Sequence, residues 1–287
     1  MNDADLEQEL EALHVQLRQR EHTFTAIDYK HLYELTGKLM QQRYGASSDF
    51  NPCSVPSISS TVMKMAEEIA PCKMLNVGMG GYPFVDIELT KRGFSVTGVE
   101  YSCSLAVLAR EVSLHRGCVI QCVVADGTRL PFGDGSFEAC LCSETVEHVK
   151  DDAAVIREIH RVLRPGGTLI FTVPCIVALL GLAKRVAYYG RERTMVLTPT
   201  HLREYTYFSA KRLIGEHFSI QRWYQVPFTT KPFKTMPYEK LLSLLVSIPM
   251  LKHFSLSLAF VLKRRDVAKG KNTGGVVRTL TRHTCSS

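Results

Sequence analysis

The chain has 287 residues, of which 45% are hydrophobic, and its formal net charge is +7. This size suits one large α/β domain with additions better than two modest domains. The acidic start M-N-D-A-D-L-E-Q-E-L lacks the basic and apolar regions of a secretory signal, and no uninterrupted apolar run reaches the length of a transmembrane helix, so we expect a cytoplasmic protein.

The first elements expected along the chain are helical. Leucines at positions 6, 10, 13 and 17 predict an amphipathic helix over residues 4–20, and a second helical pattern covers 28–43. A Pro/Ser-rich connector follows at 51–60. We expect an N-terminal helical extension with its linker over residues 1–56, which either packs on the main domain or caps its site.

The main domain is expected over residues 57–265. Its first helix runs through Met63, Met65 and Ile69, and strands and helices then alternate. We predict strands at 73–77, 94–100, 118–124, 136–142, 167–173, 218–226 and 254–263, and helices at 83–92, 103–115, 151–163 and 206–216. Such alternation is typical of a mostly parallel sheet with helices on both faces, whose ligands bind beyond the carboxyl ends of the strands.

Two insertions and a basic tail depart from this alternation. The insertions cover 175–200 and 229–252. Each contains a mainly apolar stretch, at 176–182 and 241–251. The basic residues near the end are opposed only by Asp266; they are Lys263, Arg264, Arg265, Lys269, Lys271, Arg278 and Arg282. The body of the protein is therefore near neutral, which argues against a nucleic-acid-binding face, and residues 266–287 are expected to be a disordered tail or an anchor for anionic lipid or RNA.

Nine cysteines are scattered along the chain without C-x-x-C spacing, so we expect reduced thiols and no cysteine-bound metal.

A bare turn follows the first strand of the domain. Residues 75–83 read L-N-V-G-M-G-G-Y-P, and Gly78, Gly80 and Gly81 leave the main chain open to a ligand near the start of a helix. The plain alternative is a tight strand-to-helix connection.

Two acidic residues end the next two strands. Glu100 follows Gly80 by twenty residues, where a carboxylate can accept both hydroxyls of a ribose, and Asp126 stands where it could accept from an adenine amino group. Alone, Asp126 and Gly127 would indicate a turn. A dinucleotide is disfavoured, because Pro83 occupies the position of the third small residue in its fingerprint and no second mononucleotide half follows.

The chain resembles class I S-adenosylmethionine-dependent methyltransferases, in the branch of small-molecule enzymes that modify quinones and sugars. The matching stretches are 75–83, V-T-G-V-E (96–100), A-D-G-T-R-L-P-F-G-D-G-S-F-E (125–138), S-E-T-V-E-H-V (143–149) and R-V-L-R-P-G-G-T-L-I-F-T-V-P (161–174). The resemblance implies a Rossmann-like α/β fold with a sheet of seven strands, the last antiparallel, and S-adenosylmethionine as cofactor.

The resemblance also implies roles for single residues. Gly78 and Gly80 would pass under the methionine part of the cofactor and Glu100 would hold the ribose. Asp126 with Gly127 would meet the adenine, and Ser143 with Glu144 would floor the site. Two departures stand out: Asn76 replaces the usual acidic residue, which removes a partner for the cofactor's ammonium, and Tyr82 stands where a third glycine is usual, with Gly81 one place earlier.

Catalysis is expected just past the fourth strand, because the sulfonium is already activated and the protein must mainly align the acceptor and take its proton. His148 is the first candidate for general base, and Glu144 stands beside it. The alternative is that Glu147 and His148 only cap a helix. A further alternative is a divalent ion, since Glu144-x-x-Glu147-His148 resembles a metal-binding set of some quinone and small-RNA methyltransferases; the sequence places no further histidine ligand.

The stretch T-H-L-R-E-Y-T at 200–206 offers a second base candidate in His201, and Arg203 could bind an anionic or hydroxyl-rich substrate group. Thr206 could equally be the N-cap of the next helix, with the polar residues before it an ordinary loop.

The sequence thus favours methyl transfer to a hydroxyl of a small molecule, a saccharide or a lipid-linked acceptor. The apolar insertions suit a lipophilic pocket or a peripheral membrane contact, or else core or dimer packing. A non-catalytic protein that binds S-adenosylmethionine and a nucleic-acid methyltransferase recruited by the tail are the competing hypotheses.

Overall fold

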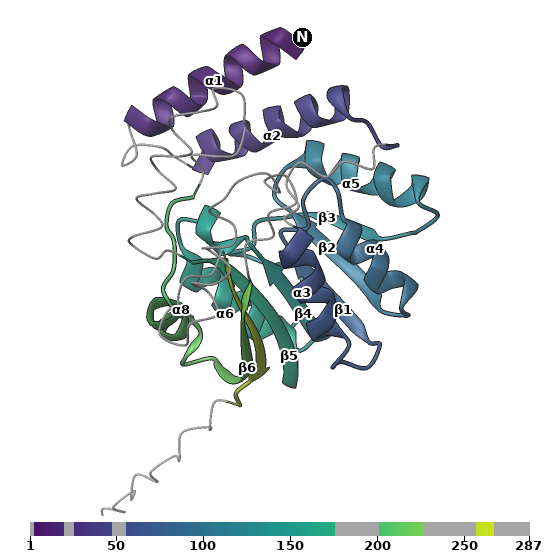
Figure 1. The fold of residues 1–287 in the computed structure, drawn as a ribbon, viewed down its shortest axis with the longest axis vertical. Helices are drawn as coiled ribbons and strands as arrows, with labels where there is room; N and C mark the ends of the chain where they lie inside the picture. Colours follow the sequence, from purple (N-terminus) through teal and green to yellow (C-terminus); the bar gives the residue numbers. More distant parts are fainter. Residues whose placement is uncertain (1–2, 20–25, 48–55, 176–200, 227–256, 267–287) are drawn as a thin grey trace, which may run out of the picture.

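A seven-stranded sheet forms the centre of the computed structural model, which describes residues 3–19, 26–47, 56–175, 201–226 and 257–266 (Figure 1). The strand order is β3-β2-β1-β4-β5-β7-β6. The strands are β1 (Lys73–Val77), β2 (Ser95–Glu100), β3 (Gln121–Val124), β4 (Phe137–Ser143), β5 (Leu163–Pro174), β6 (Phe218–Val226) and β7 (Ser257–Arg264). Strand β7 pairs antiparallel with both β5 and β6, and the other pairs are parallel. The predicted α/β fold is therefore confirmed.

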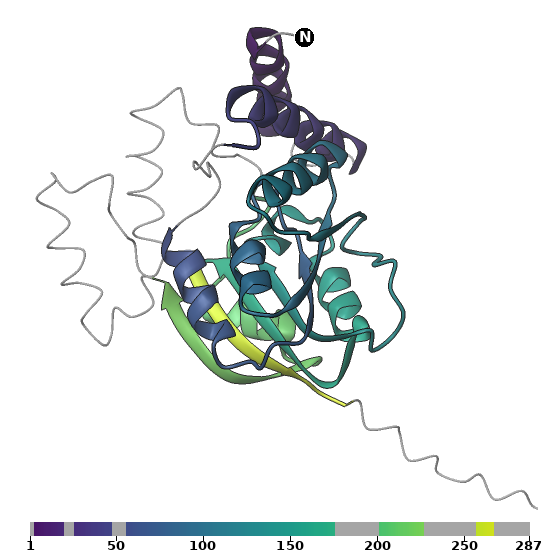
Figure 2. The same ribbon diagram turned by 90° about the vertical axis from the view of Figure 1, so that its right-hand side faces the viewer.

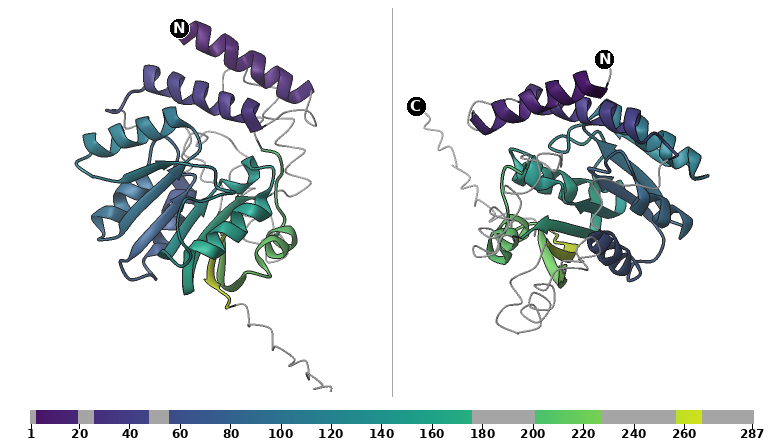
Figure 3. Two further views of the ribbon diagram at one scale, coloured as in Figure 1. Left: turned by 180° about the vertical axis from the view of Figure 1, so that it is seen from behind. Right: turned by 45° about the horizontal axis from the view of Figure 1, so that its top comes forward.

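Helices cover both faces of the sheet (Figures 1 and 3). One face carries α3 (Pro56–Ala66), α4 (Phe84–Lys91) and α5 (Cys103–His115), and the other carries α6 (Asp152–Val162) and α8 (Tyr207–Ile214). Each face has its own buried apolar cluster. Because side chains alternate along a strand, Leu75 and Val77 of β1 join the α6 side, whereas Met74 joins the α4 side. Asn76 has the same parity as Met74 and lies toward α4.

Three predicted boundaries are wrong by three or four residues. Strand β3 begins at Gln121 instead of 118. Strand β5 begins at Leu163 instead of 167, because Leu163 pairs with Phe137 of β4 across a register shift. Helix α3 ends at Ala66, short of Ile69, whose backbone N–H donates to the Ala66 carbonyl in a tight turn.

The N-terminal extension, here helices α1 (Asp3–Gln19) and α2 (Ala26–Arg43), stacks above the α5 end of the sheet (Figure 2). Its two helices bury their own leucine cluster, which consists of Leu6, Leu10, Leu32, Leu35 and Leu39. Helix α2 then lies on α5, and Gly37 permits the close approach: a Cβ there would lie 2.7 Å from the Cβ of Ser104.

Glu34 fastens the extension to the domain. Its carboxylate accepts the backbone N–H groups of Cys103 and Ser104, at 2.6 and 2.9 Å, and the Ser104 hydroxyl at 2.6 Å. These groups form the N-terminus of α5, where a negative charge is favoured. Burial raises the pKa of Glu34, but the hydrogen bonds from Ser104 and Cys103 outweigh it, so the pKa is lowered overall.

Several predicted segments lie outside the described residues: the first part of the connector (51–55), the apolar stretches 176–182 and 241–251, and the tail beyond Asp266. The second part of the predicted connector, 56–60, is helical and begins α3. Within the described part, no helix is both long and apolar enough to cross a membrane. The seven cysteines described there are free thiols.

Candidate functional site

A pocket of about 560 Å³ opens at the carboxyl ends of β1, β2 and β4. Its volume falls in the range of small-molecule sites. The glycine turn after β1 and the ends of β2 and β4 form one side, and α2 of the N-terminal extension contributes Tyr29, Tyr33, Thr36 and Met40. The extension therefore both packs on α5 and covers the pocket, which combines the two roles left open by the sequence.

The glycine turn needs glycine for two different reasons. Gly78 has φ +82°, and a Cβ there would lie 2.5 Å from the side chain of Thr145. The Thr145 hydroxyl donates to the Val77 carbonyl, so this contact holds the loop after β4 against β1. Gly80 has φ +69° and no atom within 4 Å of an added Cβ, because it faces the pocket. A side chain at Gly80 would occupy ligand space.

Gly81 and Tyr82 complete the turn in a way that differs from the usual third glycine. An added Cβ at Gly81 would lie 3.0 Å from methyl groups of Leu105 and Leu108, so Gly81 lets the turn pack on α5. Tyr82 is 6% exposed, and its hydroxyl lies 3.3 Å from the Gly45 carbonyl and 3.5 Å from that of Met40. Tyr82, which stands where a third glycine is usual, thus joins the turn to the N-terminal extension.

Glu100 ends β2 as a buried carboxylate at the pocket wall. One oxygen accepts the Gly80 N–H and the other accepts the Ser102 N–H, both at 3.0 Å. Burial raises the pKa of Glu100, and these two bonds oppose the rise. The chain itself thus holds the carboxylate in place, and the ribose-binding role expected of Glu100 stays a prediction.

Asn76 and Asp86 form a buried pair beside the turn. The Asn76 Nδ2 donates to both carboxylate oxygens of Asp86, at 2.8 and 3.0 Å. Burial raises the pKa of Asp86 to about 7, while the hydrogen bond from Asn76 lowers it. Both residues line the pocket. Asp86 was missed by the sequence analysis.

The other predicted cofactor residues also meet at the pocket. Asp126, Gly127 and Ser143 all line it. Asp126 closes a turn, since its Oδ1 accepts both the N–H and the hydroxyl of Thr128, so the plain interpretation is confirmed without excluding a ligand. The adenine and methionine contacts expected of these residues stay predictions.

Glu144 lies at the floor of the pocket in an unusual backbone conformation, with φ +50°. Its carboxylate accepts from the hydroxyls of Thr172 on β5 and Ser257 on β7, at 2.9 and 3.1 Å. These bonds tie Glu144 to the sheet, which favours a structural role over the catalytic one that the sequence suggested.

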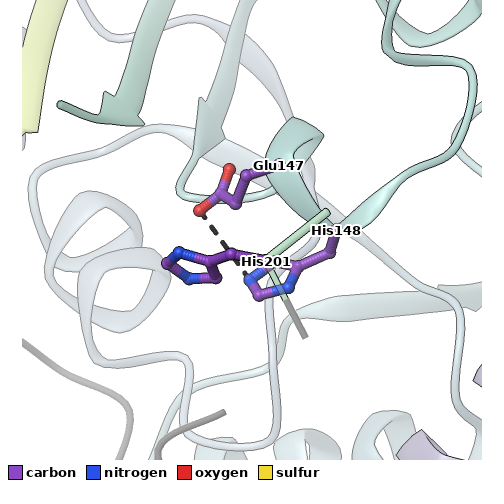
Figure 4. A group of neighbouring side chains, drawn as sticks. All are labelled: Glu147, His148 and His201. Carbon is purple, nitrogen blue, oxygen red and sulfur yellow. Dashed lines mark ion pairs between the residues drawn. The ribbon is translucent and has the colours of Figure 1, made fainter. Parts of the chain in front are cut away.

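Glu147, His148 and His201 form a cluster next to the floor (Figure 4). Glu147 and His148 belong to η1 (Val146–His148), a single turn of 3-10 helix. The His148 Nε2 lies 3.7 Å from Oε1 of Glu147, and the two imidazole centroids are 4.8 Å apart. Glu147 is fully buried, and neither of its oxygens has a hydrogen-bond partner among the described residues. Burial, followed by the charge of Glu144, raises the pKa of Glu147.

His201 reaches this cluster because residues 201–205 are fastened to the loop after β4. The Leu202 N–H donates to the Glu147 carbonyl at 2.8 Å, and the Tyr205 hydroxyl donates to Asp152 at 2.8 Å. Arg203 forms an ion pair with Asp152 at 2.7 Å, and donates to the Lys150 carbonyl. The guanidinium of Arg203 is therefore engaged within the chain, which disfavours the substrate-binding role considered for it.

The remaining interpretation of this stretch is confirmed: Thr206 is the N-cap of α8, in a capping box with Ser209. Of the two residues predicted in this stretch, His201 therefore lies in the cluster with Glu147 and His148, whereas Thr206 caps the helix.

The pocket fits S-adenosylmethionine chemically. Gly80 leaves room along the main chain, Glu100 offers a fixed carboxylate, and the buried Oδ1 of Asn76 has no hydrogen-bond partner among the described residues. An adenosine with a cationic amino-acid arm presents hydroxyl and ammonium donors that suit these acceptors.

Comparisons with known proteins agree with this geometry. Residues 75–171 match the family model described as a methyltransferase domain. An uncharacterized methyltransferase of Mycobacterium sp. (strain KMS) is 35% identical over 134 residues, which are 45% of this chain and 48% of that protein. A ubiquinone biosynthesis O-methyltransferase of Chromobacterium violaceum is 27% identical over 183 residues, 62% of this chain and 76% of that one. The chain spans about half the length of the mycobacterial relative.

The fold has solved counterparts. The crystal structure of the [4+2]-cyclase SpnF superposes with a TM-score of 0.57 at 20% identity, covering 85% of this chain and 97% of that one. A likeness at this identity supports the fold alone, and a fold does not fix a reaction. Residues 75–171 thus carry a methyltransferase domain within a Rossmann-like α/β fold, and the cofactor is S-adenosylmethionine.

Proposed function

We propose that the full chain transfers the methyl group of S-adenosylmethionine to a hydroxyl of a small molecule. The observation that carries the proposal is the placement of His148 in the wall of the same pocket that holds the glycine turn and Glu100. When bound, the cofactor supplies a methyl group already activated for displacement. The chain then has to align a hydroxyl oxygen with that methyl group and take its proton.

His148 is the proposed proton acceptor. Its Nε2 faces Glu147, whose buried carboxylate would stabilise the imidazolium, and Nδ1 on the other side of the ring would accept the hydroxyl proton. Tyr33 of α2 meets the same imidazole edge to face, with centroids 6.2 Å apart. The N-terminal extension thereby helps to keep water away from this side of the pocket.

The same cluster also suits a divalent cation. Glu147, His148 and His201 each offer one ligand atom within 4.8 Å of the others, a donor set of one carboxylate and two imidazoles. Such a set suits zinc or another transition ion, and a cation there would lower the pKa of an acceptor hydroxyl. The sequence does not place the additional histidine that this alternative needs, and in the proposed site it would be His201.

An acceptor with an apolar body is favoured by the part of the pocket wall that α2 and α3 supply. Tyr29, Met40, Ile58 and Val62 line it, from α2 and α3. The C. violaceum relative is named for ubiquinone biosynthesis. We therefore favour a lipid-linked acceptor over a free saccharide, with peripheral membrane contact through the apolar insertions as a further expectation.

The test is transfer of tritiated methyl from S-adenosylmethionine by the purified chain into a fractionated extract of the source cell. Label in an organic-soluble small molecule, stable to mild alkali, is the expected result, because a methyl ether resists alkali whereas a methyl ester is cleaved. Alkali-labile label would exclude the hydroxyl, and label in nucleic acid would favour recruitment by the tail. A chain that binds the cofactor yet labels no fraction would favour a non-catalytic binding protein.

Chelation separates the two ways of taking the proton. If His148 acts alone, dialysis against EDTA leaves the rate unchanged. If a cation is held by the cluster, EDTA abolishes transfer and added zinc or magnesium restores it, and His201→Ala weakens metal binding measured directly on the chain.

A further inference from the structure

The buried pair of Asn76 and Asp86 stands at the carboxyl half of β1, on the α4 side of the sheet. Asn76 is 5% exposed and Asp86 is 1% exposed. Asp86 comes from the first turn of α4, the helix that the glycine turn introduces. A carboxylate rarely stays buried unless another group pairs with it. Here the amide of Asn76 is its partner.

This pairing fixes the orientation of the amide. Because an ionised carboxylate can only accept hydrogen bonds, the Nδ2 of Asn76 must face Asp86 and its Oδ1 must face the other way. The Oδ1 atom is buried, and no donor reaches it among the described residues. A buried carbonyl left without a donor costs about 1–3 kcal/mol. The arrangement is thus an acceptor prepared for a donor that the described part of the chain does not supply.

The pocket indicates where that donor comes from. Asn76 and Asp86 line the same pocket as Gly78 and Gly80. The carboxylate of Asp86 lies directly behind the Asn76 amide, so a negative charge is held beside the glycine turn.

We propose that Asn76 and Asp86 act together as the binding site for the ammonium group of the cofactor's methionine part. Asn76 Oδ1 accepts a hydrogen bond from the ammonium, and Asp86 orients the amide and supplies the negative charge. This inference rests on the proposed function, since it takes S-adenosylmethionine as the ligand. Asn76 is the contact residue and Asp86 the positioning residue.

Two ligands test the pair without any catalytic assay. S-adenosylhomocysteine carries the ammonium, whereas 5′-methylthioadenosine has the same adenosine and no amino-acid arm. In isothermal titration, Asp86→Asn should weaken S-adenosylhomocysteine about tenfold and leave 5′-methylthioadenosine within about twofold, because only the first ligand presents a cation to the pair. Glu88→Gln, on the exposed side of the same helix, should change neither affinity.

A double variant that exchanges the two residues separates an effect on binding from an effect on folding. Asn76→Asp combined with Asp86→Asn puts the acid back at position 76 and keeps an amide–carboxylate pair. Its affinity for S-adenosylhomocysteine should return to within about threefold of wild type. Melting curves of the three variants verify that each is folded.

Other outcomes would overturn the proposal. Asp86→Asn could weaken both ligands equally, which would mark a purely structural role, or it could leave both unchanged. A wild-type chain that binds 5′-methylthioadenosine as tightly as S-adenosylhomocysteine would remove the ammonium site while leaving the cofactor pocket in place. Binding of neither ligand to wild type would overturn the pair's role and the proposed function together.

Discussion

The two halves of the pocket are built differently. On the cofactor side, each carboxylate already has hydrogen-bond donors from the chain: Glu100 has Gly80 and Ser102, and Asp86 has Asn76. On the acceptor side, the buried oxygens of Glu147 have no hydrogen bond among the described residues, and two imidazoles stand close by. A surface prepared for binding has its charges fixed in advance. A surface that takes part in proton transfer needs a group that can gain or lose a proton during the reaction.

The largest expected effect breaks the acceptor side alone. His148→Ala should lower kcat about 100-fold, since it removes the proposed proton acceptor, while the affinity for S-adenosylhomocysteine stays within about twofold. Steady-state kinetics measure kcat, and isothermal titration measures the affinity for S-adenosylhomocysteine. An unchanged kcat would remove His148 from the mechanism, and a parallel loss of affinity would contradict the separation of the two halves.

A glycine substitution breaks the cofactor side, with a matched control in the same chain. Gly80 and Gly117 both have φ +69° and open space around an added Cβ, but Gly117 lies at the end of α5, away from the pocket. Both Gly→Ala variants should lose about 1 kcal/mol of stability from the strained backbone. Only Gly80→Ala should also weaken cofactor binding, about tenfold, because its methyl group enters ligand space. Equal affinities in the two variants would place the ligand elsewhere.

The buried acid on the cofactor side predicts a pH dependence of stability. Folding raises the pKa of Asp86 from its ordinary value of 3.8 to about 7. The native state therefore binds more protons than the unfolded state between these values, and the free energy of unfolding falls as pH rises through this window. Relative to Asp86→Asn, wild type should lose up to about 1.4 kcal/mol per pH unit there. Urea unfolding at several pH values measures the slope, and parallel profiles for the two proteins would contradict it.

The smallest effect concerns the fastening of the N-terminal extension. Glu34→Gln keeps one acceptor oxygen but removes the charge at the N-terminus of α5, so cofactor affinity should fall only about twofold. Hydrogen exchange of the α2 amides should quicken. Glu11→Gln, on an exposed part of α1, is the matched control and should change neither quantity. Slow exchange in Glu34→Gln would show that the leucine contacts and Gly37 suffice.

How far the sequence predicts this molecule depends on how local each feature is. The alternation of strands and helices, the glycine turn and the strand-end acids follow from local patterns, and the structure brings the turn and the acids to one pocket. Asp86 could not be identified as buried, because one acid among apolar residues of a short helix also suits a solvent-facing position until packing selects the face. The sequence identifies His201 as a base candidate but not its place beside His148. That place depends on the hydrogen bonds of residues 201–205 to the loop after β4, and the sequence pattern does not predict these bonds.

Tyr82 has a practical consequence for anyone who trims or recombines this chain. Its ring is packed under residues that precede the methyltransferase domain, and its hydroxyl points at carbonyls of that earlier segment. A shortened gene product starting at residue 57 would uncover an aromatic side chain at the glycine turn of the cofactor pocket. Exchange of this domain with another should therefore move the N-terminal extension and the turn together.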